Sequence, residues 1–252
     1  MNSFRLILLL LSPLLSIAPS KASAELRVLA AASLSDALQG VGEHYTETTG
    51  ESVRFSFGSS GALARQIREG VPADVFVSAD ALHMDQLESE ALLLDGSRRT
   101  ILRNALVLIV DARQGPTIAS LQDLTGAAIR RLAVGEPATV PAGTYAKTIL
   151  EQAGLWAVLE PKIVPLHNVR SVLAAVEAGN ADAGFVYRTD ALISSRVTIA
   201  VSIPTQTGPD IRYPAAVLQQ STQTRAAQAF VDYLISPDAQ RIFERYGFLP
   251  GH

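Results

Sequence analysis

Two serine-bearing turns in the first third of the chain have residue types that can bind an anion. Each turn lies between an expected strand and an expected helix, at Ala30–Leu34 and Phe57–Leu63. A serine hydroxyl at the start of a helix lies beside backbone N–H groups without intrahelical partners and beside the positive end of the helix dipole. Such a turn can bind an anion without a charged side chain. Ser33, Ser59 and Ser60 are therefore candidate anion ligands.

Three more strand-to-helix junctions occur in the second half, at Val140–Thr144, His167–Arg170 and Phe185–Asp190. In the first, Pro141 suits a helix start, and the small residues Ala142 and Gly143 let backbone N–H groups approach a ligand. In the second, Asn168 is the expected helix N-cap. In the third, Tyr187 ends a strand and precedes a short helix. Open α/β sheets bind ligands beyond the carboxyl ends of their strands, so all five junctions could meet at one ligand.

Each junction also has an ordinary structural interpretation. Ser33 taken alone is more typical of a helix N-cap than of a ligand. Ser59 and Ser60 could form a polar turn, and Tyr187 could be a half-buried core residue. The functional interpretation is favoured because the segments occur together and in this order.

The elements that must position these residues alternate between strand and helix. The expected strands are 26–31, 53–57, 74–78, 102–110, 132–134, 163–164, 183–187, 197–201 and 213–218. The expected helices are 34–48, 62–69, 81–88, 142–153, 169–177, 223–235 and 237–246. Within this set, 102–110 is expected to be the longest apolar strand. The alternation predicts an α/β fold with open, mostly parallel sheets covered by helices on both faces.

Residues 1–24 have the pattern of a cleaved signal peptide. Arg5 gives a positive start, residues 6–18 are almost wholly apolar, and Ala22–Ala24 is an A-x-A cleavage pattern. The apolar run is shorter than the roughly 20 residues that a membrane span needs, which disfavours an uncleaved anchor. The mature chain is expected to begin at Glu25 and to be exported, most simply to a bacterial periplasm.

The composition sets limits on the partners. The chain has no cysteine, and a mature length of about 228 residues can bury a core without disulfides. Arg5 and Lys21 are the only charged residues of the first 24, so removing that segment changes the net charge from −3 to −5. An acidic chain has no general field for anions, which makes any anion selectivity local. The same balance argues against nucleic acid.

The chain resembles the periplasmic molybdate-binding proteins of ABC importers over nearly all of its mature length. The segments that carry the resemblance are Ala30–Leu34, Phe57–Gly61, Gly70–Asp80, Leu132–Pro137, Val140–Gly143, Asn168–Arg170, Val186–Tyr187 and Arg245–Phe248. One departure from the family pattern is Arg188, where small residues are usual, and it could alter the rim of the cleft.

The resemblance implies a fold, a site and a partner. The implied fold is the two-lobed type II fold of periplasmic binding proteins, with hinge strands crossing between lobe I (residues 25–102 and 211–252) and lobe II (residues 103–210). The ligand is molybdate or tungstate, with no cofactor and no free metal cation. The implied partner is the membrane permease of a molybdate ABC importer, and we expect a monomer. The implied ligand residues are the hydroxyls of Ser33, Ser60 and Tyr187 and the backbone N–H groups of Ala142 and Val169.

The chemistry of this donor set suits a tetrahedral dianion. Molybdate has four acceptor oxygens, and hydroxyl and backbone N–H groups can all donate to them. Hydrogen phosphate carries a proton that needs an acceptor, and the implied set contains no carboxylate, so we expect phosphate to be rejected. Sulfate is excluded only by size, and tungstate should bind like molybdate.

Two alternatives remain. The first is a binding protein for another small anion such as sulfate; an amino acid would instead need an arginine, and Arg170 is expected to face outward or pair with an acid. The second is a secreted serine hydrolase, although Gly58–Ala62 is not a G-x-S-x-G turn. The four histidines show no metal or triad spacing and are expected at the surface. The protein is therefore expected not to be an enzyme.

Overall fold

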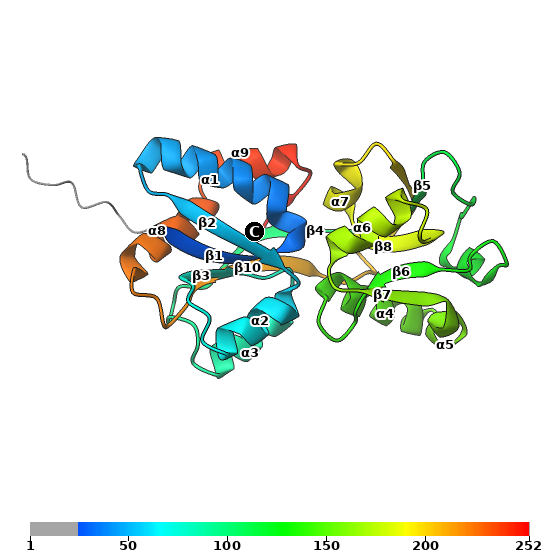
Figure 1. The fold of residues 1–252 in the computed structure, drawn as a ribbon, viewed down its shortest axis with the longest axis horizontal. Helices are drawn as coiled ribbons and strands as arrows, with labels where there is room; N and C mark the ends of the chain where they lie inside the picture. The colour runs from blue at the N-terminus through cyan, green and yellow to red at the C-terminus, as the bar shows by residue number, and fades with distance from the viewer. Residues whose placement is uncertain (1–24, 252) are drawn as a thin grey trace, which may run out of the picture.

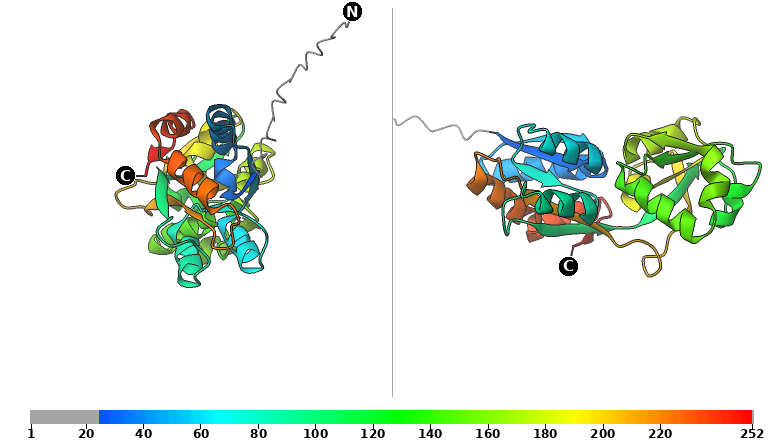
Figure 2. Two further views of the ribbon diagram at one scale, coloured as in Figure 1. Left: turned by 90° about the vertical axis from the view of Figure 1, so that its left-hand side faces the viewer. Right: turned by 90° about the horizontal axis from the view of Figure 1, so that it is seen from below.

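The computed structural model describes residues 25–251, which form two bodies joined side by side (Figures 1 and 2). We call the body around the six-stranded sheet lobe I and the body around the five-stranded sheet lobe II. The expected signal peptide lies outside the described residues. Within residues 25–251, no helix has the length and apolar character required to cross a membrane.

The sheet of lobe I brings the two serine turns to the same edge. Its strands run in the order β11-β4-β10-β3-β1-β2. Their bounds are β1 (Leu26–Ala31), β2 (Val53–Gly58), β3 (Val75–Val77), β4 (Arg99–Asn104), β10 (Ile211–Val217) and β11 (Leu249–Pro250). The strands β1 and β2 are parallel, with Ala31 opposite Gly58 at their carboxyl ends. The turns that follow these strands therefore begin side by side.

The sheet of lobe II brings the other three junctions to one edge in the same way. Its order is β7-β6-β8-β5-β9. The bounds are β5 (Leu106–Asp111), β6 (Leu132–Gly135), β7 (Ile163–Leu166), β8 (Ala183–Tyr187) and β9 (Val197–Ser202). The strands β7, β6 and β8 are parallel, as predicted, whereas β5 pairs antiparallel with both neighbours. In lobe I, β10 pairs antiparallel with β3 and β4, and β11 pairs antiparallel with β4, so both sheets are mixed.

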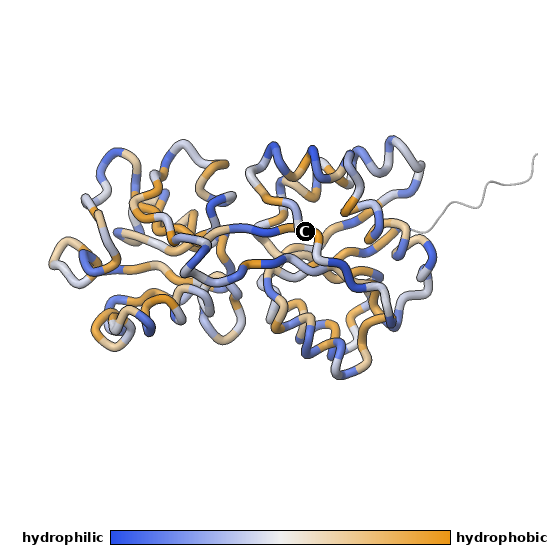
Figure 3. The backbone as a smooth tube through the Cα atoms, turned by 180° about the vertical axis from the view of Figure 1, so that it is seen from behind, coloured by the Kyte–Doolittle hydropathy of each residue, from blue (hydrophilic) through white to orange (hydrophobic). Residues whose placement is uncertain are grey.

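Helices cover both sheets. Those of lobe I are α1 (Ser35–Thr49), α2 (Ser60–Arg68), α3 (Ala81–Ser89), α8 (Thr224–Leu234) and α9 (Pro237–Arg245). Those of lobe II are α4 (Pro141–Gln152), α5 (Trp156–Leu159), α6 (Val169–Glu177) and α7 (Arg188–Leu192). Helical spacing of apolar residues explains their packing: α8 buries Ala227, Phe230, Val231 and Leu234. The apolar segments accordingly follow the strands and the inner faces of the helices (Figure 3).

The prediction of one long strand at 102–110 is wrong. The run is divided at Ala105 into β4 and β5, which belong to different sheets. At the crossing, the Ala105 N–H donates to Asn104 Oδ1 (2.9 Å) and the Ala105 carbonyl accepts from the Arg188 N–H (2.8 Å). The apolar pattern runs through the break because Ile101 and Leu102 of β4 and the first residues of β5 are all buried, so periodicity alone cannot show that the two halves belong to different sheets. The chain returns to lobe I between β9 and β10.

Candidate functional site

All five junctions predicted from the sequence line one pocket between the lobes. The space between its lining atoms is about 210 Å³, including the part that is open to solvent. Lobe I contributes Ala31, Ala32, Ser33, Gly58, Ser59, Ser60 and Ala79. Lobe II contributes Val140, Pro141, Ala142, Asn168, Val169 and Tyr187. The side chains of this set carry no charge, so the pocket can hold an anion only through dipoles and hydrogen bonds.

The lobe I wall presents three buried serines, of which Ser33 and Ser60 are the least exposed. Ser33 lies in a 3₁₀ turn (Ala32–Leu34) after β1, and its Oγ is 3.1 Å from Tyr213 Oη. No side-chain capping bond starts this turn or α1, so the N-cap interpretation of Ser33 is wrong. Ser60 begins α2, and its Oγ accepts the Ala79 N–H at 2.9 Å. Both hydroxyls are almost fully buried, with 2% and 0% exposure.

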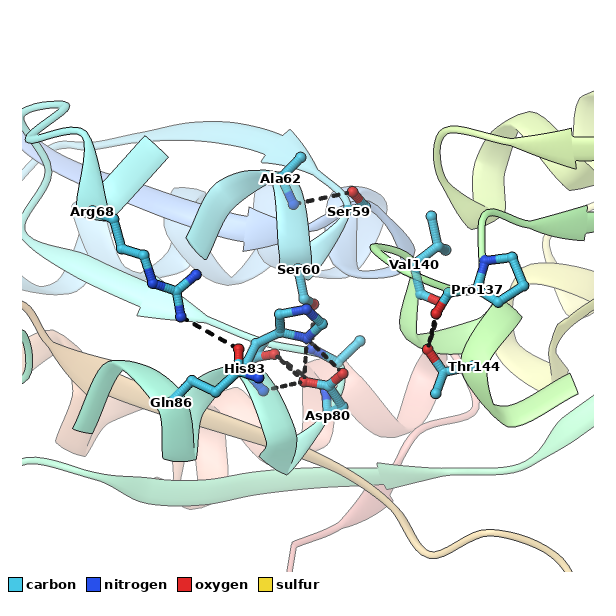
Figure 4. A network of polar contacts seen from close by, with 12 residues as sticks. Ser59, Ser60, Ala62, Arg68, Asp80, His83, Gln86, Pro137, Val140 and Thr144 are labelled. Carbon is cyan, nitrogen blue, oxygen red and sulfur yellow. Dashed lines mark hydrogen bonds and ion pairs between the residues drawn. The ribbon is translucent and has the colours of Figure 1, made fainter. Parts of the chain in front are cut away.

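Ser59 has a different role from Ser60. It is the N-cap of α2, and its Oγ accepts the Ala62 N–H at 3.4 Å (Figure 4). Capping satisfies one of the free N–H groups of the first turn of the helix. Ser59 and Ser60 both accept a backbone N–H, and both keep a hydroxyl proton in the pocket lining. The cap gives Ser59 an additional role, which is to start α2.

The lobe II wall presents backbone N–H groups at two helix starts. Pro141 is the first residue of α4 and has no N–H, so Ala142 supplies the first N–H of that helix. Val169 is the first residue of α6, whose N-cap is Asn168, as predicted; the Asn168 side chain accepts the Ser171 N–H at 2.9 Å. N–H groups in a first turn have no intrahelical partner. Both can therefore donate to an anion in the pocket.

A close backbone contact holds the start of α4 against β6. A Cβ atom added to Gly143 would lie 1.8 Å from the carbonyl oxygen of Gly135. Only a residue without a side chain allows the helix to approach the strand end this closely. This contact sets the position of the Ala142 N–H in the pocket wall.

Tyr187 carries an unpaired polar atom into the pocket. It ends β8 and is 1% exposed. Within the described residues, its hydroxyl is buried and has no hydrogen-bond partner. Burial raises the pKa of Tyr187 well above its usual value, so the hydroxyl keeps its proton. Because an unpaired buried donor is costly, the hydroxyl fits a ligand that can accept from it.

Arg170 joins the two lobes beside the pocket. Its Nε is 2.7 Å from Asp190 Oδ1 on its own lobe. Its Nη2 is 2.6 Å from Asp36 Oδ2 on lobe I and donates to the Ser33 carbonyl at 3.3 Å. Burial raises the pKa of Asp190 to about 7, and the Arg170 cation opposes that rise. The expectation that Arg170 pairs with an acid is confirmed.

A second contact between the lobes lies on the other side of the pocket. The Gly61 N–H donates to the Thr139 carbonyl at 3.0 Å. A Cβ on Gly61 would lie 2.6 Å from that carbonyl oxygen, so this approach requires glycine. Figure 4 shows the α2 start with Ser59 facing Val140 of lobe II. The structure is thus a closed form, with direct polar contacts across the pocket.

His83 differs from its expected surface position. It is 7% exposed, and its Nδ1 lies 2.8 Å from Asp80 Oδ2 (Figure 4). Asp80 also caps α3 by accepting the His83 N–H at 3.1 Å. The pair lies close to Ser60, but the Ser60 hydroxyl bonds to the Ala79 N–H. Among residues 25–251, no group of three or more His, Asp or Glu side chains is placed to hold a metal ion.

Two polar residues behind the pocket were not found from the sequence. Tyr213 contacts Ser33, and Asn104 donates to Tyr213 Oη at 3.2 Å. Asn104 and Tyr213 lie 71 and 180 residues beyond Ser33, in β4 and β10, and no local motif marks them. Arg188 is not in the pocket lining; its Nη1 lies 3.7 Å from the position of a Cβ on Gly247 of lobe I.

Comparisons with known proteins agree with this geometry. The family model of bacterial extracellular solute-binding proteins matches residues 26–249. The molybdate-binding protein ModA of Escherichia coli (strain K12) is 40% identical over 228 residues, covering 89% of this chain and 88% of that protein. The solved periplasmic molybdate-binding protein of Azotobacter vinelandii has a TM-score of 0.80 at 27% identity, covering 89% of this chain and 99% of that chain.

A third match is the substrate-binding domain of a putative molybdenum ABC transporter from Clostridium difficile. It has a TM-score of 0.69 at 36% identity and covers 90% of this chain and 98% of that chain. The matches in sequence and in structure both extend over most of the chain, so they include both walls of the pocket.

Proposed function

Since the chain belongs to the bacterial extracellular solute-binding proteins, within the ModA family of molybdate-binding proteins, we propose that its inter-lobe pocket binds molybdate for an ABC importer. The observation that carries this function is the Tyr187 hydroxyl, a buried donor without a protein partner in a pocket of uncharged donors. A dianion with four acceptor oxygens would satisfy it together with the serine and backbone donors of both lobes.

The finer points of this proposal come from the donor set. Ser33, Ser60 and Tyr187 would donate through their hydroxyls, and Ala142 and Val169 through backbone N–H groups. Tungstate offers the same four acceptors and would bind too. The two lobes would close over the ligand; β4 extends lobe I to Asn104, two residues beyond the boundary at 102 expected from the sequence. The protein would act in the periplasm as a monomer without a cofactor, and would deliver its ligand to a membrane permease.

Ligand binding should raise the melting temperature, because only the folded protein has the pocket. At a free molybdate concentration about 100-fold above Kd, linkage stabilises the folded state by about 2.7 kcal/mol. For a chain of this size, the melting temperature rises by roughly 5–11 °C. Differential scanning calorimetry should give a similar shift with tungstate and almost none with phosphate. A shift with an amino acid or phosphate, but none with molybdate, would sink the proposal.

The two adjacent serines give a matched pair for testing the site. Ser60→Ala should weaken molybdate binding by about 1.5–3 kcal/mol, because it removes a hydrogen bond to a charged ligand. Ser59→Ala removes a helix cap, so it should mainly cost about 1 kcal/mol of stability. Isothermal calorimetry and urea unfolding of both variants separate these effects. The assignment fails if Ser59→Ala is the variant that loses affinity.

Tyr187→Phe tests the lobe II side of the pocket. The ring and its packing remain, and the unpaired hydroxyl is removed, so folding should not suffer. Molybdate affinity should drop about ten- to a hundredfold, as for loss of one bond to a charged ligand. Unchanged affinity in the folded variant would remove Tyr187 from the ligand set. Esterase activity that disappears in Ser60→Ala would instead support the hydrolase alternative.

A further inference from the structure

A chain of buried hydrogen bonds behind the pocket has a defined direction, and it begins at Asn104. The Ala105 N–H donates to the side-chain oxygen of Asn104 at 2.9 Å. An N–H group can only donate, so this contact fixes which end of the Asn104 amide is the oxygen. The amide NH₂ therefore points the other way, where it donates to Thr189 Oγ1 (2.9 Å) and to Tyr213 Oη (3.2 Å).

The donor-to-acceptor direction of these hydrogen bonds continues from Asn104 through Tyr213 to Ser33. Tyr213 is fully buried, and burial raises its pKa well above its usual value, so its hydroxyl keeps one proton to donate. The Tyr213 oxygen accepts from Asn104, and its proton needs an acceptor of its own. Among the described residues, Ser33 Oγ at 3.1 Å is the hydrogen-bond partner of Tyr213 that can accept this proton, so we take Tyr213 as the donor in that bond.

The serine that receives this bond has its own proton left for the pocket. Ser33 lines the pocket, and because Tyr213 donates to its oxygen, the Ser33 proton is left to point toward the ligand. Ser60 is arranged in the same way, because its Oγ accepts the Ala79 N–H at 2.9 Å. Ser33 and Ser60 are thus both held as donors toward the ligand, Ser60 by a backbone group and Ser33 by Tyr213.

We propose that the chain Asn104–Tyr213–Ser33 fixes the Ser33 hydroxyl as a donor and thereby makes the site select oxyanions without a proton. Asn104 and Tyr213 are then positioning residues that act through Ser33. A protonated oxyanion such as hydrogen phosphate needs an acceptor for its proton, and an oppositely turned Ser33 could supply one. The inference rests on the proposed role of Ser33 in binding molybdate.

A double-mutant cycle tests whether Tyr213 acts through Ser33. Tyr213→Phe keeps the ring that packs edge-on against Tyr187, at a centroid distance of 5.8 Å. It should weaken molybdate binding about three- to tenfold in the otherwise native chain, and almost not at all in Ser33→Ala. Equal weakening in both backgrounds would mean that Tyr213 only packs, and would overturn the inference. Thr189→Val is the control: it removes the other partner of the Asn104 amide, and molybdate affinity should be unchanged.

Reversing the direction of the Asn104–Tyr213–Ser33 hydrogen bonds gives a second, independent test. Asn104→Asp keeps an acceptor for the Ala105 N–H and, when ionised, replaces the NH₂ donor by a second acceptor. Tyr213 would then donate to position 104, Ser33 would donate to Tyr213, and a lone pair of Ser33 would face the ligand. The inhibition constants of hydrogen phosphate and of sulfate are measured by their competition with molybdate. We expect the hydrogen phosphate constant divided by the sulfate constant to fall about tenfold or more in this variant.

The ratio of the two inhibition constants separates the effect of hydrogen-bond direction from other effects of the substitution. Above neutral pH both competitors are dianions, so repulsion by the new carboxylate affects both, as does any loosening of the pocket. A folded Asn104→Asp protein with an unchanged ratio, or one in which no anion competes or binds, would overturn the inference. Failure of the native protein to bind molybdate would instead overturn the proposed function, so the two failures can be distinguished.

Discussion

Arg170→Ala is expected to lower the free energy of unfolding by about 3–5 kcal/mol where Asp190 is ionised, because it leaves a buried carboxylate without its cation, and by less at lower pH, where this carboxyl takes up a proton. Asp190 is fully buried, and its Oδ1 lies 2.7 Å from Arg170 Nε. The same substitution removes the contacts of Arg170 with Asp36 and the Ser33 carbonyl, which hold the lobes together. Urea unfolding should show the loss of stability, and small-angle scattering without ligand should show a more open protein.

The pH dependence of this loss follows from Asp190. Without Arg170, its pKa should rise further above the value of about 7 that burial already gives it. A carboxyl whose pKa is raised by folding contributes most stability below its unfolded pKa and loses that contribution as the pH rises through its folded pKa. The variant should therefore lose more stability at about pH 8 than at about pH 5.

An exposed ion pair provides the control. Arg54 Nε is 2.6 Å from Glu25 Oε2, but these side chains are 71% and 40% exposed. Solvent screens such a pair, so Arg54→Ala should cost less than about 1 kcal/mol. If the Arg54 and Arg170 variants lost equal stability, with no dependence on pH, the role of the buried Asp190 carboxylate would be disproved.

Gly143→Ala is expected to be the most damaging single-methyl substitution at the site. The added Cβ would lie 1.8 Å from the carbonyl oxygen of Gly135 and 2.5 Å from its carbon, and both are backbone atoms. Relief of that clash requires α4 to move away from β6, at a cost of about 3 kcal/mol or more. The movement also displaces the Ala142 N–H, so molybdate affinity should fall together with the melting temperature.

Gly40→Ala is the matched control for this substitution. Gly40 lies inside α1, and a Cβ there would meet its nearest atom, a methyl carbon of Ile242, at an ordinary 3.6 Å. Alanine is favoured over glycine in a helix interior by roughly 0.5–1 kcal/mol, so this variant should be slightly more stable than the native protein. A Gly143→Ala protein as stable as the Gly40→Ala protein would show that α4 has room to move.

The sequence is most informative where the structure depends on short-range pattern. The helix N-cap at Asn168 follows from residue type and position, and it is confirmed by the bond of its side chain to the first turn of α6. The junctions themselves are also local, and the parallel pairing of β1 with β2 brings two of them together.

The sequence is least informative where distant segments meet. The pairing of Ser33 with Tyr213 spans 180 residues, and the buried His83 ring lies close to Gly61 of the neighbouring helix α2. The break at Ala105 was missed for a related reason, since the apolar pattern there continues from a buried strand of one sheet into a buried strand of the other. Such contacts depend on the relative placement of whole elements, which residue pattern does not encode.

The position of β10 in the sheet of lobe I has a consequence for the order of folding. This strand lies between β3 and β4, although it follows all of lobe II in the chain. A nascent chain that ends before Ile211 can complete the sheet of lobe II, but its lobe I sheet has a missing strand in the middle. Completion of the lobe I sheet therefore requires a long-range strand insertion, which is intrinsically slow. We expect the pocket wall of lobe II to form before that of lobe I, although the residues of lobe I come first in the chain.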